Sequence, residues 1–569
     1  MSMTNPTEPN ENLAIGSIIE VDGTHVVAEL KTEIKELLRV YAGETYYIGQ
    51  FGSIVKILHG PHTIYGYVSR LRMKSEYERD LGIVSTASNT RIVEVDLFGE
   101  GLWDFENSIT PPKWELKFER GVSHYPLPQQ TMYLTPKNEL RSIYNKTGDS
   151  VLSIGEHVGS SGAPCYVDIN ELLGKHTAIL GSTGSGKSAT VAAILHSIVN
   201  RKTERKYEKW NPKIVILDPH GEYSNSFQEH VRFSTEDSSI KLPYWLFNYQ
   251  ESLSLFVGKS ERAATSQTNI LKTALFESRK AGAEILKIDS EKITVDSPIP
   301  YSCHDLIERI NSQKPKAASD QKSHNSIIEK IEKISEDPRM NFLMENWDGA
   351  TDPTESIIAQ FFGNGPAIRI IDLSGVPNEV AGIASAVISR LIFSFKLWQT
   401  IEERASNPIL LVCEEAHRYV PNRGDAQYGD AQEGIRRLAK EGRKYGIGLF
   451  LVSQRPSEVE ATVLSQCNSW IVLRITNEND REYVKAMLPD SLSGLSRILS
   501  GLRRREAIIV GLATMLPSRI LIRELEASEL PASQDINFDK GWQKDNISAD
   551  EIHRVMNRWR LQTRTDPTQ

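Results

Sequence analysis

Residues 181–188 read GSTGSGKS, and this stretch decides the fold of the core. It matches the pattern G-x-x-x-x-G-K-S/T of a phosphate-binding loop at every defined position, and it directly follows the apolar run TAIL at 177–180. Residues 189–199 continue with apolar side chains at helical spacing. Strand, loop and helix in this order are the context that the motif needs. The stretch therefore predicts a nucleoside triphosphate site and disfavours a chance glycine-rich turn.

The residues of this loop have distinct predicted roles. The glycines allow the backbone to curl until successive N–H groups point at the phosphates, and the following helix adds its positive N-terminus. We expect Lys187 to place its charge on the β- and γ-phosphate oxygens and the Ser188 hydroxyl to bind Mg²⁺. The predicted ATP-binding residues are Gly181, Ser182, Thr183, Gly184, Ser185, Gly186, Lys187, Ser188 and Ala189.

The composition is that of a soluble globular protein. With 569 residues, 39% hydrophobic and 25% charged, the chain has room for about two to four domains. Its four cysteines lie far apart without a C-x-x-C pair, which predicts neither a zinc site nor a disulfide framework and favours a reducing compartment. We therefore expect a cytoplasmic protein.

Targeting and charge give two further expectations. The N-terminal segment MSMTNPTEPNENLAIG is polar, and we expect no apolar run of membrane-spanning length and hence no membrane association. The formal charge is 66 − 74 = −8, so the surface as a whole does not favour a polyanion. Any nucleic acid must be held by a local basic lining.

Residues 1–160 have the pattern of a β domain. Short β-branched and aromatic runs separated by glycine predict a small closed or half-closed β-barrel, in which we find no catalytic constellation. The expected strands include 16–21, 24–30, 52–57, 63–68 and 91–95.

Strands alternate with helices in the rest of the chain. This alternation predicts a parallel sheet in two stretches, 161–250 and 347–530, with a charged helical insertion at 251–346 between them. Residues 531–569 form a polar tail with one amphipathic helix at about 549–561. The fold class is therefore α/β. The strands expected in the core include 213–217, 367–372, 409–413 and 449–453, and the expected helices of the insertion are 268–282, 304–312 and 324–335.

A second chemical signal is ILLVCEEAH at 409–417, an apolar strand that ends in two adjacent carboxylates. We expect Glu414 to orient Mg²⁺ through its water shell and Glu415 to polarise the attacking water. Alternation along the strand would point one carboxylate to the metal and the next to the γ-phosphate. The alternative is that the two glutamates only favour the N-terminus of a solvated helix.

Other stretches resemble the HerA family, the FtsK-related hexameric DNA translocases. They are LDPHGEY at 217–223, CEEAHRYVP at 413–421, LAKEGRKYGIGL at 438–449 and VSQRPSEVEATVLSQCNSWIVLRITNENDRE at 452–482, with IGSIIEV and YYIGQFGSIVKI resembling the barrel domain of that family. The resemblance covers most of the chain. It implies a RecA-like P-loop ATPase core with a helical-bundle insertion, preceded by a small β-barrel. It also implies a hexameric ring that moves double-stranded DNA using ATP and Mg²⁺.

The resemblance assigns further roles and shows two departures. The first residue of the acid pair is usually aspartate in the family and is Glu414 here, and Lys440 stands where relatives often carry arginine. Arg443 is then the first candidate, and Arg437 the second, for an arginine that acts on a neighbouring subunit's site. A solvated basic face, which also includes Arg436 and Lys444, is the alternative.

Polar residues follow two other strands of the expected sheet. Gln454 stands where RecA-like enzymes place a residue that senses the γ-phosphate. Asp218, His220 and Glu222 follow the strand 213–217, at the carboxyl end where ligands gather, although Asp-Pro-His-Gly is equally good turn chemistry.

Partners follow mainly from the resemblance. It implies a DNA motor that works with a NurA-like nuclease or a Sir2-like effector, in antiviral defence or in DNA end resection; the alternative is a ring that mainly assembles and regulates the effector. A membrane DNA pump and a replicative single-strand helicase fit the motifs less well. The candidate DNA contacts are Arg423, Lys137 and Arg141.

Overall fold

A computed structural model of the chain describes residues 5–561 except 35, 51, 84–88, 107–112, 145–148, 159–162, 206–208, 236–238, 259–263, 376–377, 423–428, 488–497, 533–537 and 544–546. The chain forms two compact units. The first comprises Met1–Arg201, Gln454–Ser457 and Cys467–Glu524, and the second comprises Lys202–Ser453, Glu458–Gln466 and Leu525–Gln569.

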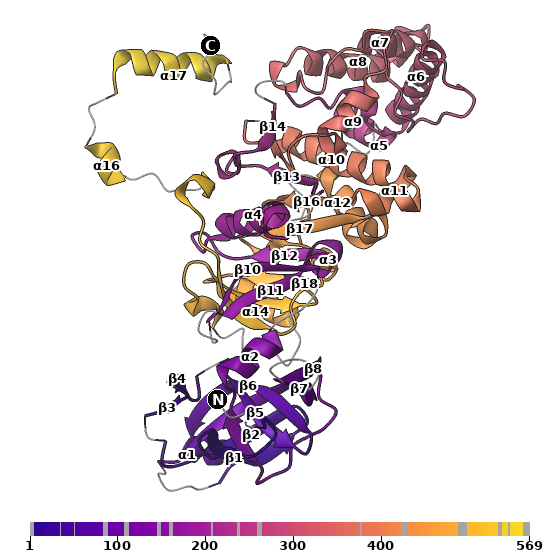
Figure 1. Cartoon of the computed structure of the whole chain (residues 1–569). Coiled ribbons are helices and arrows are strands. Elements are labelled where there is room, and N and C mark those ends of the chain that lie inside the picture. The colour runs from indigo at the N-terminus through magenta and orange to yellow at the C-terminus, as the bar shows by residue number, and fades with distance from the viewer. Residues whose placement is uncertain are drawn as a thin grey trace. The chain divides into compact units, whose positions relative to one another are not determined.

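The first unit begins with the expected barrel, shown in indigo in Figure 1. Its antiparallel strands follow the order β2-β1-β9-β5-β6-β7-β8, and an additional pairing of β2 with β7 closes six of them, leaving β8 on the outside of β7. The barrel is therefore closed, and apolar side chains fill its interior. The strands are β1 (Ala14–Asp22), β2 (His25–Leu30), β5 (Ile54–His59), β6 (His62–Met73), β7 (Arg91–Glu106), β8 (Lys113–Arg120) and β9 (Thr131–Leu134).

Two small elements accompany the barrel. A separate hairpin of β3 (Leu38–Tyr41) and β4 (Glu44–Tyr47) precedes β5, and the short helix α1 (Lys74–Asp80) follows β6. Helix α2 (Lys137–Tyr144) follows β9 and buries Leu140, Ile143 and Tyr144 in a second apolar cluster with outer barrel residues and Leu516.

The first unit also contains part of the core sheet, with strand order β11-β10-β20-β19-β18-β12. Strands β12 and β18 are parallel, and the other pairs are antiparallel. Strand β10, which the sequence division placed with the barrel, pairs with β11 and β20 instead. The strands are β10 (Val151–His157), β11 (Ala163–Asp168), β12 (Thr177–Leu180), β18 (Ser469–Val472), β19 (Glu506–Gly511) and β20 (Ser518–Ile522).

Three helices belong to this part of the first unit. They are α3 (Ile169–Gly174), α4 (Lys187–Arg205) and α14 (Glu478–Met487). Helix α3 begins where the Asp168 side chain accepts hydrogen bonds from the backbone N–H groups of Asn170 and Glu171, which would otherwise lack partners.

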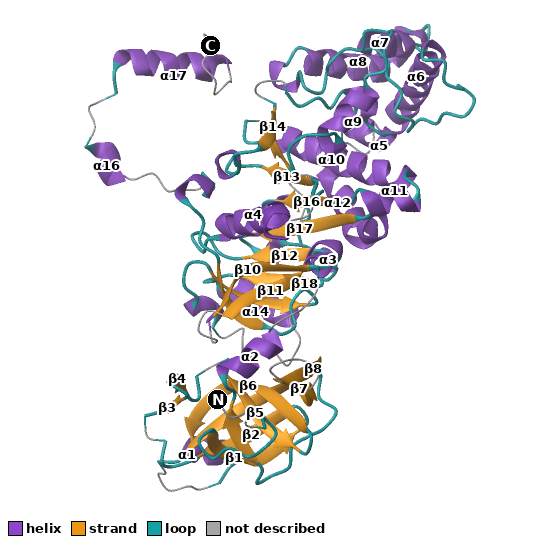
Figure 2. Ribbon diagram, in the orientation of Figure 1, coloured by secondary structure: helices purple, strands orange, loops and turns teal. Residues whose placement is uncertain are grey.

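The second unit contains a parallel sheet of order β17-β16-β13-β15-β14. Most of its strand residues are apolar and buried, as expected for a parallel sheet covered on both faces. Figure 2 distinguishes these strands from the surrounding helices. The strands are β13 (Ile214–Asp218), β14 (His230–Ser234), β15 (Ile368–Asp372), β16 (Ile409–Cys413) and β17 (Ile447–Ser453).

The three helices expected in the insertion and the expected tail helix are present in the second unit, together with helices that the sequence analysis did not predict. The insertion contains α6, α7 and α8, which pack against one another. The helices are α5 (Tyr249–Phe256), α6 (Ala264–Ile285), α7 (Cys303–Ser312), α8 (Lys322–Ser335), α9 (Thr354–Phe362), α10 (Asn378–Trp398), α11 (Ile401–Ser406), α12 (Gly429–Glu441), α13 (Ala461–Leu464), α16 (Phe538–Trp542) and α17 (Ala549–Leu561).

Helix α10 corrects one expectation from the sequence. Its segment Ala381–Trp398 has the length and composition of a membrane span, with a mean hydropathy of 1.3, although the sequence analysis expected no such run. In the structure 67% of that segment is buried, and α10 packs against α12. A mostly buried helix of this kind is typical of a protein core, so the segment is weak evidence for a membrane.

Candidate nucleotide-binding and hydrolysis site

The phosphate loop connects β12 to α4 in the first unit. Gly184 and Gly186 have φ angles of +73° and +92°, in the left-handed region that favours glycine. A Cβ atom at Gly181 would lie 2.7 Å from the Ser185 hydroxyl, so this position also requires glycine. Helix α4 begins directly at Lys187, whose side chain is 6% exposed.

Several segments of the first unit hold the loop in place. The backbone N–H of Ser182 donates to the carbonyl of Arg474 at 2.9 Å, and its hydroxyl accepts from the backbone N–H of Thr476 at 3.1 Å. On another side, the Thr183 hydroxyl donates to the Gln454 side-chain carbonyl at 2.6 Å. Gln454 thus contacts the phosphate loop, which suits the sensing role that the sequence predicts.

The loop fits a bound phosphate chain. The buried hydroxyl of Ser185 has no hydrogen-bond partner among the described residues, so it can donate to an oxygen of a ligand. The two left-handed glycines and the N-terminus of α4 form a concave cradle of backbone N–H groups, which is typical of an anion site. The predicted ATP-binding residues 181–189 therefore lie together in a suitable geometry.

An arginine run that the sequence analysis missed lies beside this cradle. Arg505 donates its backbone N–H to the Ser185 carbonyl at 3.4 Å, and Arg504 Cγ would lie 3.7 Å from a Cβ atom at Gly186. Arg503 and Arg504 have exposed side chains. The signal was the run RRR at 503–505, directly before a strand, and these cations add positive charge beside the phosphate loop.

The acid pair lies at the end of β16 in the second unit. Strand β16 ends at Cys413, so Glu414 and Glu415 follow the strand instead of extending it. Glu415 has a φ of +54°, a left-handed conformation that is strained for a non-glycine residue. The two buried glutamates therefore lie in a turn, whereas the sequence analysis expected them to alternate as in a strand.

Each carboxylate of the pair has its own partner. The Tyr223 hydroxyl donates to Glu414 Oε1, and both side chains are buried. Glu415 Oε2 lies 3.2 Å from His417 Nδ1, and His417 Nδ1 also lies 3.4 Å from the Ser453 hydroxyl at the end of β17. Tyr223 belongs to the LDPHGEY stretch, but the sequence analysis gave it no role.

The LDPHGEY stretch forms a turn around Asp218. The buried Asp218 carboxylate accepts backbone N–H bonds from His220, Gly221 and Tyr223 at 3.2, 2.9 and 3.0 Å. Burial raises the pKa of Asp218 to about 7, and the nearby charges of Glu414 and Asp372 act in the same direction against these hydrogen bonds. Asp218 therefore has a structural role in the turn, while the Glu222 side chain remains partly exposed.

The candidate arginines differ in their surroundings. Arg436 pairs with Glu460 at 2.6 Å, whereas Arg437 lies 4.2 Å above the ring of Phe393 and 3.7 Å from Glu441. Arg443, in the short 3₁₀ helix Gly442–Tyr445, is exposed, and its side chain has no ion pair or hydrogen bond within the described part of the chain. Arg443 is thus the candidate that is available to a second subunit.

The surroundings of the candidate DNA-contacting residues do not indicate a DNA-binding surface. Lys137 pairs with Glu44 and lies 6.0 Å from the Tyr46 ring centre, so its charge is already partly neutralised. Arg141 is exposed on α2, and Arg423 lies outside the described residues.

The comparisons with known proteins agree with this site. The family model described as "Helicase HerA, central domain" matches residues 152–392, which include the phosphate loop. The protein is 27% identical over 481 residues to "DNA double-strand break repair helicase HerA" of Pyrococcus furiosus, covering 78% of this chain and 82% of that protein.

One further relative and one solved structure are also similar to the chain. A HerA helicase of Saccharolobus solfataricus is 27% identical over 402 residues, with 70% of this chain and 73% of that protein covered. Among solved structures, VirB4 of Thermoanaerobacter pseudethanolicus aligns with a TM-score of 0.48 and 18% identity, covering 67% of this chain and 98% of that chain.

The phosphate cradle between β12 and α4 and the parallel α/β sheet define a P-loop ATPase with a RecA-like core. Residues 152–392 match the central domain of the HerA helicases, and most of the chain is similar to HerA-family helicase ATPases.

Proposed function

We propose that the protein is an ATP-driven translocase of double-stranded DNA that works as a homo-oligomeric ring, with six subunits as in the family it resembles. The geometry of the phosphate loop carries the ATP-dependent part of this proposal. The relatives named as DNA double-strand break repair helicases support DNA as the substrate. A cytoplasmic location agrees with the four buried, unpaired cysteines.

The residues of the site have the following proposed roles. Lys187 binds the β- and γ-phosphates, while Ser188 and Glu414 hold Mg²⁺, Glu414 through a water molecule. Glu415 polarises the attacking water, and His417, 3.2 Å away, fixes the direction of its carboxylate. Gln454 accepts a hydrogen bond from Thr183 and follows directly after β17. It senses whether a γ-phosphate is present and couples this to the position of the end of β17.

The oligomeric part of the proposal rests on Arg443. Its side chain is exposed and has no partner among the described residues, so we assign it to the nucleotide site of a neighbouring subunit. Such an arginine stabilises the charge on the transferring phosphoryl group. Hydrolysis would then depend on assembly.

The test is the ATPase rate of the purified chain with and without linear duplex DNA, together with its mass in solution. We expect a low rate for the chain alone, stimulation by duplex DNA, and a ring of uniform mass with nucleotide. Lys187→Ala should abolish both rates. Stimulation that persists in that variant would refute the assigned site, and a strictly monomeric chain that is fully active would refute the ring.

A second function is favoured by the hairpin β3–β4. Leu38, Val40 and Tyr47 are exposed on it, with Val40 70% exposed, and exposed apolar clusters mark contact surfaces. We propose that this hairpin binds a protein effector, a NurA-like nuclease or a Sir2-like enzyme, and that the ring assembles and regulates it, in antiviral defence or DNA end resection.

A matched pair of variants tests the effector site. Val40→Asp should abolish the stimulation of ATP hydrolysis by an added NurA-like nuclease, while DNA-stimulated hydrolysis remains unchanged. Leu127→Asp is the control, because Leu127 is a 60% exposed apolar residue elsewhere in the first unit. Equal loss in both variants would count against a specific role of the hairpin.

A further inference from the structure

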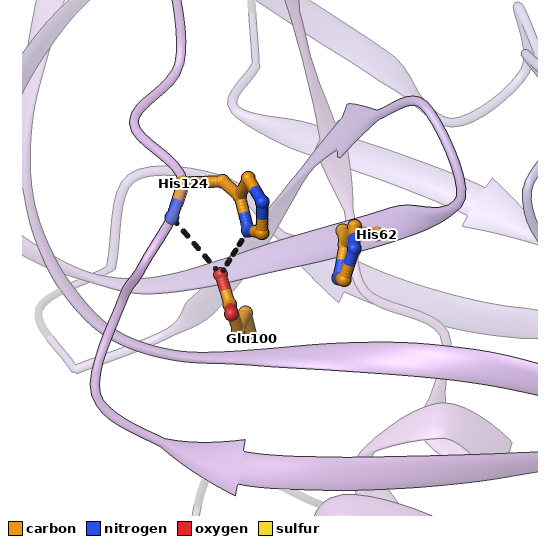
Figure 3. A group of neighbouring side chains, drawn as sticks. All are labelled: His62, Glu100 and His124. Atoms are coloured by element: carbon orange, nitrogen blue, oxygen red, sulfur yellow. Dashed lines mark hydrogen bonds and ion pairs between the residues drawn. The ribbon is translucent and has the colours of Figure 1, made fainter.

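Three side chains of the barrel present metal-ligating atoms to one another, as Figure 3 shows. They are His62 at the start of β6, Glu100 in β7 and His124 in the segment after β8, and one ligand atom from each lies within 4.8 Å of the others. In the register of β6 and β7, His62 pairs with Leu102 and Ile64 with Glu100. His62 and Glu100 are therefore diagonal neighbours on one face of the sheet.

The backbone brings His124 to this pair. Gly121, with a φ of +97°, turns the chain after β8 and donates its backbone N–H to the Phe98 carbonyl at 3.0 Å. Glu100 Oε2 then accepts the backbone N–H groups of Ser123 and His124, both at 3.2 Å. The segment that carries His124 is thus anchored on the carboxylate itself.

The side chains have free ligand positions. Glu100 Oε2 lies 3.1 Å from His124 Nδ1, which leaves His124 Nε2 for another partner. Within the described ranges, Glu100 Oε1 and both ring nitrogens of His62 lack hydrogen-bond partners. The rings of His62 and His124 are stacked, with centroids 4.3 Å apart and planes inclined by 27°. Two protonated imidazoles would repel each other at this distance, whereas two neutral ones can share a cation.

The position of the carboxylate supports cation binding. Glu100 is only 9% exposed, and its Oε2 accepts the backbone N–H groups of Ser123 and His124. The site therefore combines a carboxylate held in place by the backbone with two imidazoles.

A further histidine, His59, lies near the cluster but is not one of its three members. His59 ends β5, across a tight turn from His62, and its ring centroid lies 6.0 Å from that of His124. Gln130 Nε2 lies 3.5 Å from His59 Nδ1, which leaves Nε2 of His59 for a ligand. The sequence analysis considered only the cysteines as zinc ligands, and therefore predicted no zinc site.

We propose that His62, Glu100 and His124 bind a divalent first-row transition metal of the Zn²⁺ class, with a water molecule in the remaining coordination position. Imidazole and carboxylate ligands suit Zn²⁺, whereas Mg²⁺ and Ca²⁺ prefer oxygen ligands alone. Two ligands at the usual distance of about 2.1 Å can lie at most about 4.2 Å apart, so binding draws the three groups slightly closer. The metal would cross-link three segments of the barrel.

Titration of the untagged, EDTA-treated full chain with Co²⁺, in the absence of nucleotide, tests this proposal. We expect one equivalent to bind with a visible d–d absorption band, to be displaced by Zn²⁺, and to show no near-ultraviolet thiolate band, which excludes the cysteines. Zn²⁺ should also raise the temperature of thermal unfolding.

Variants locate the ion. His62→Ala and Glu100→Gln should each weaken Co²⁺ binding at least about tenfold. His304→Ala is the control, because His304 is an exposed histidine of α7. His62 lacks a side-chain hydrogen bond among the described residues, so its variant should fold even if a variant of His124 does not. A missing d–d band, a thiolate band, or equal binding by the variants and the control would overturn the proposal.

Discussion

Arg443→Ala should abolish ATP hydrolysis while leaving the fold and nucleotide affinity unchanged. The exposed Arg443 side chain has no ion pair or hydrogen bond within the described residues, so its removal should change the free energy of unfolding by less than about 0.5 kcal/mol. An arginine that acts in trans contributes about 10³-fold or more to the rate, which corresponds to about 4 kcal/mol. Arg443→Ala should therefore lower the rate of ATP hydrolysis strongly while leaving the free energy of unfolding nearly unchanged.

Arg437→Ala should behave in the opposite way. Its contact with Glu441 at 3.7 Å is half exposed and contributes about 0.2–0.5 kcal/mol, and its position above Phe393 contributes about 0.5–1 kcal/mol. We expect a loss of about 1 kcal/mol of stability and a small change in rate. Lys444→Ala, which removes an exposed neighbouring cation, is the control for a general charge effect.

A mixing assay tests action between subunits directly. Lys187→Ala and Arg443→Ala chains should each be inactive, but in the proposed ring a mixture of the two would place an intact phosphate loop beside an intact Arg443. Mixing should restore part of the DNA-stimulated ATPase activity, measured as phosphate release. Full activity of Arg443→Ala alone, or no recovery in rings shown to be mixed, would refute the assignment.

Three other perturbations test the site. Glu415→Gln should bind ATP normally but hydrolyse it about 10²–10⁴-fold more slowly, because the amide cannot act as a base; nucleotide binding and single-turnover rates measure this difference. Gly186→Ala should lose nucleotide affinity because its φ of +92° is strained for alanine, while Gly174→Ala, in open space at ordinary φ, should not; fluorescent-nucleotide titration compares them. The pKa of Asp218, raised to about 7 by burial, lies above its value in the unfolded chain of about 3.9, so this group makes stability fall as pH rises from about 4 to 7. Asp218→Asn should remove that slope in urea unfolding, and a slope equal to that of the parent protein would contradict the shift.

Local signals in the sequence were sufficient for the centre of the fold. Strand β12 has the predicted bounds Thr177–Leu180, because an apolar run and a glycine-rich loop define both of its ends. The tail helix α17 likewise has its predicted bounds, because its amphipathic pattern is complete within one segment. The small β-barrel, expected to be closed or half-closed, and the P-loop core were also predicted correctly.

Features that depend on distant pairings were harder to predict. The barrel closes through β2 and β7, and β10 joins β20, a strand from much later in the chain. The contact of Tyr223 with Glu414 and the cluster of His62, Glu100 and His124 likewise join segments that no local pattern connects. The sequence shows which side chains can bind metals or form hydrogen bonds, but it does not show which of these side chains contact one another.

The hydrogen bond from the Tyr223 hydroxyl constrains which acidic residue can occupy position 414. An aspartate at position 414 would place the carboxylate about 1.5 Å further from Tyr223, the length of one carbon–carbon bond. The buried Tyr223 hydroxyl would then lose its hydrogen-bond partner. Positions 223 and 414 should therefore change together among relatives. We expect tyrosine at 223 where 414 is glutamate, and phenylalanine at 223 where 414 is aspartate. A change in the conformation of the turn that carries Tyr223 would also move the carboxylate of Glu414, which we propose to hold Mg²⁺.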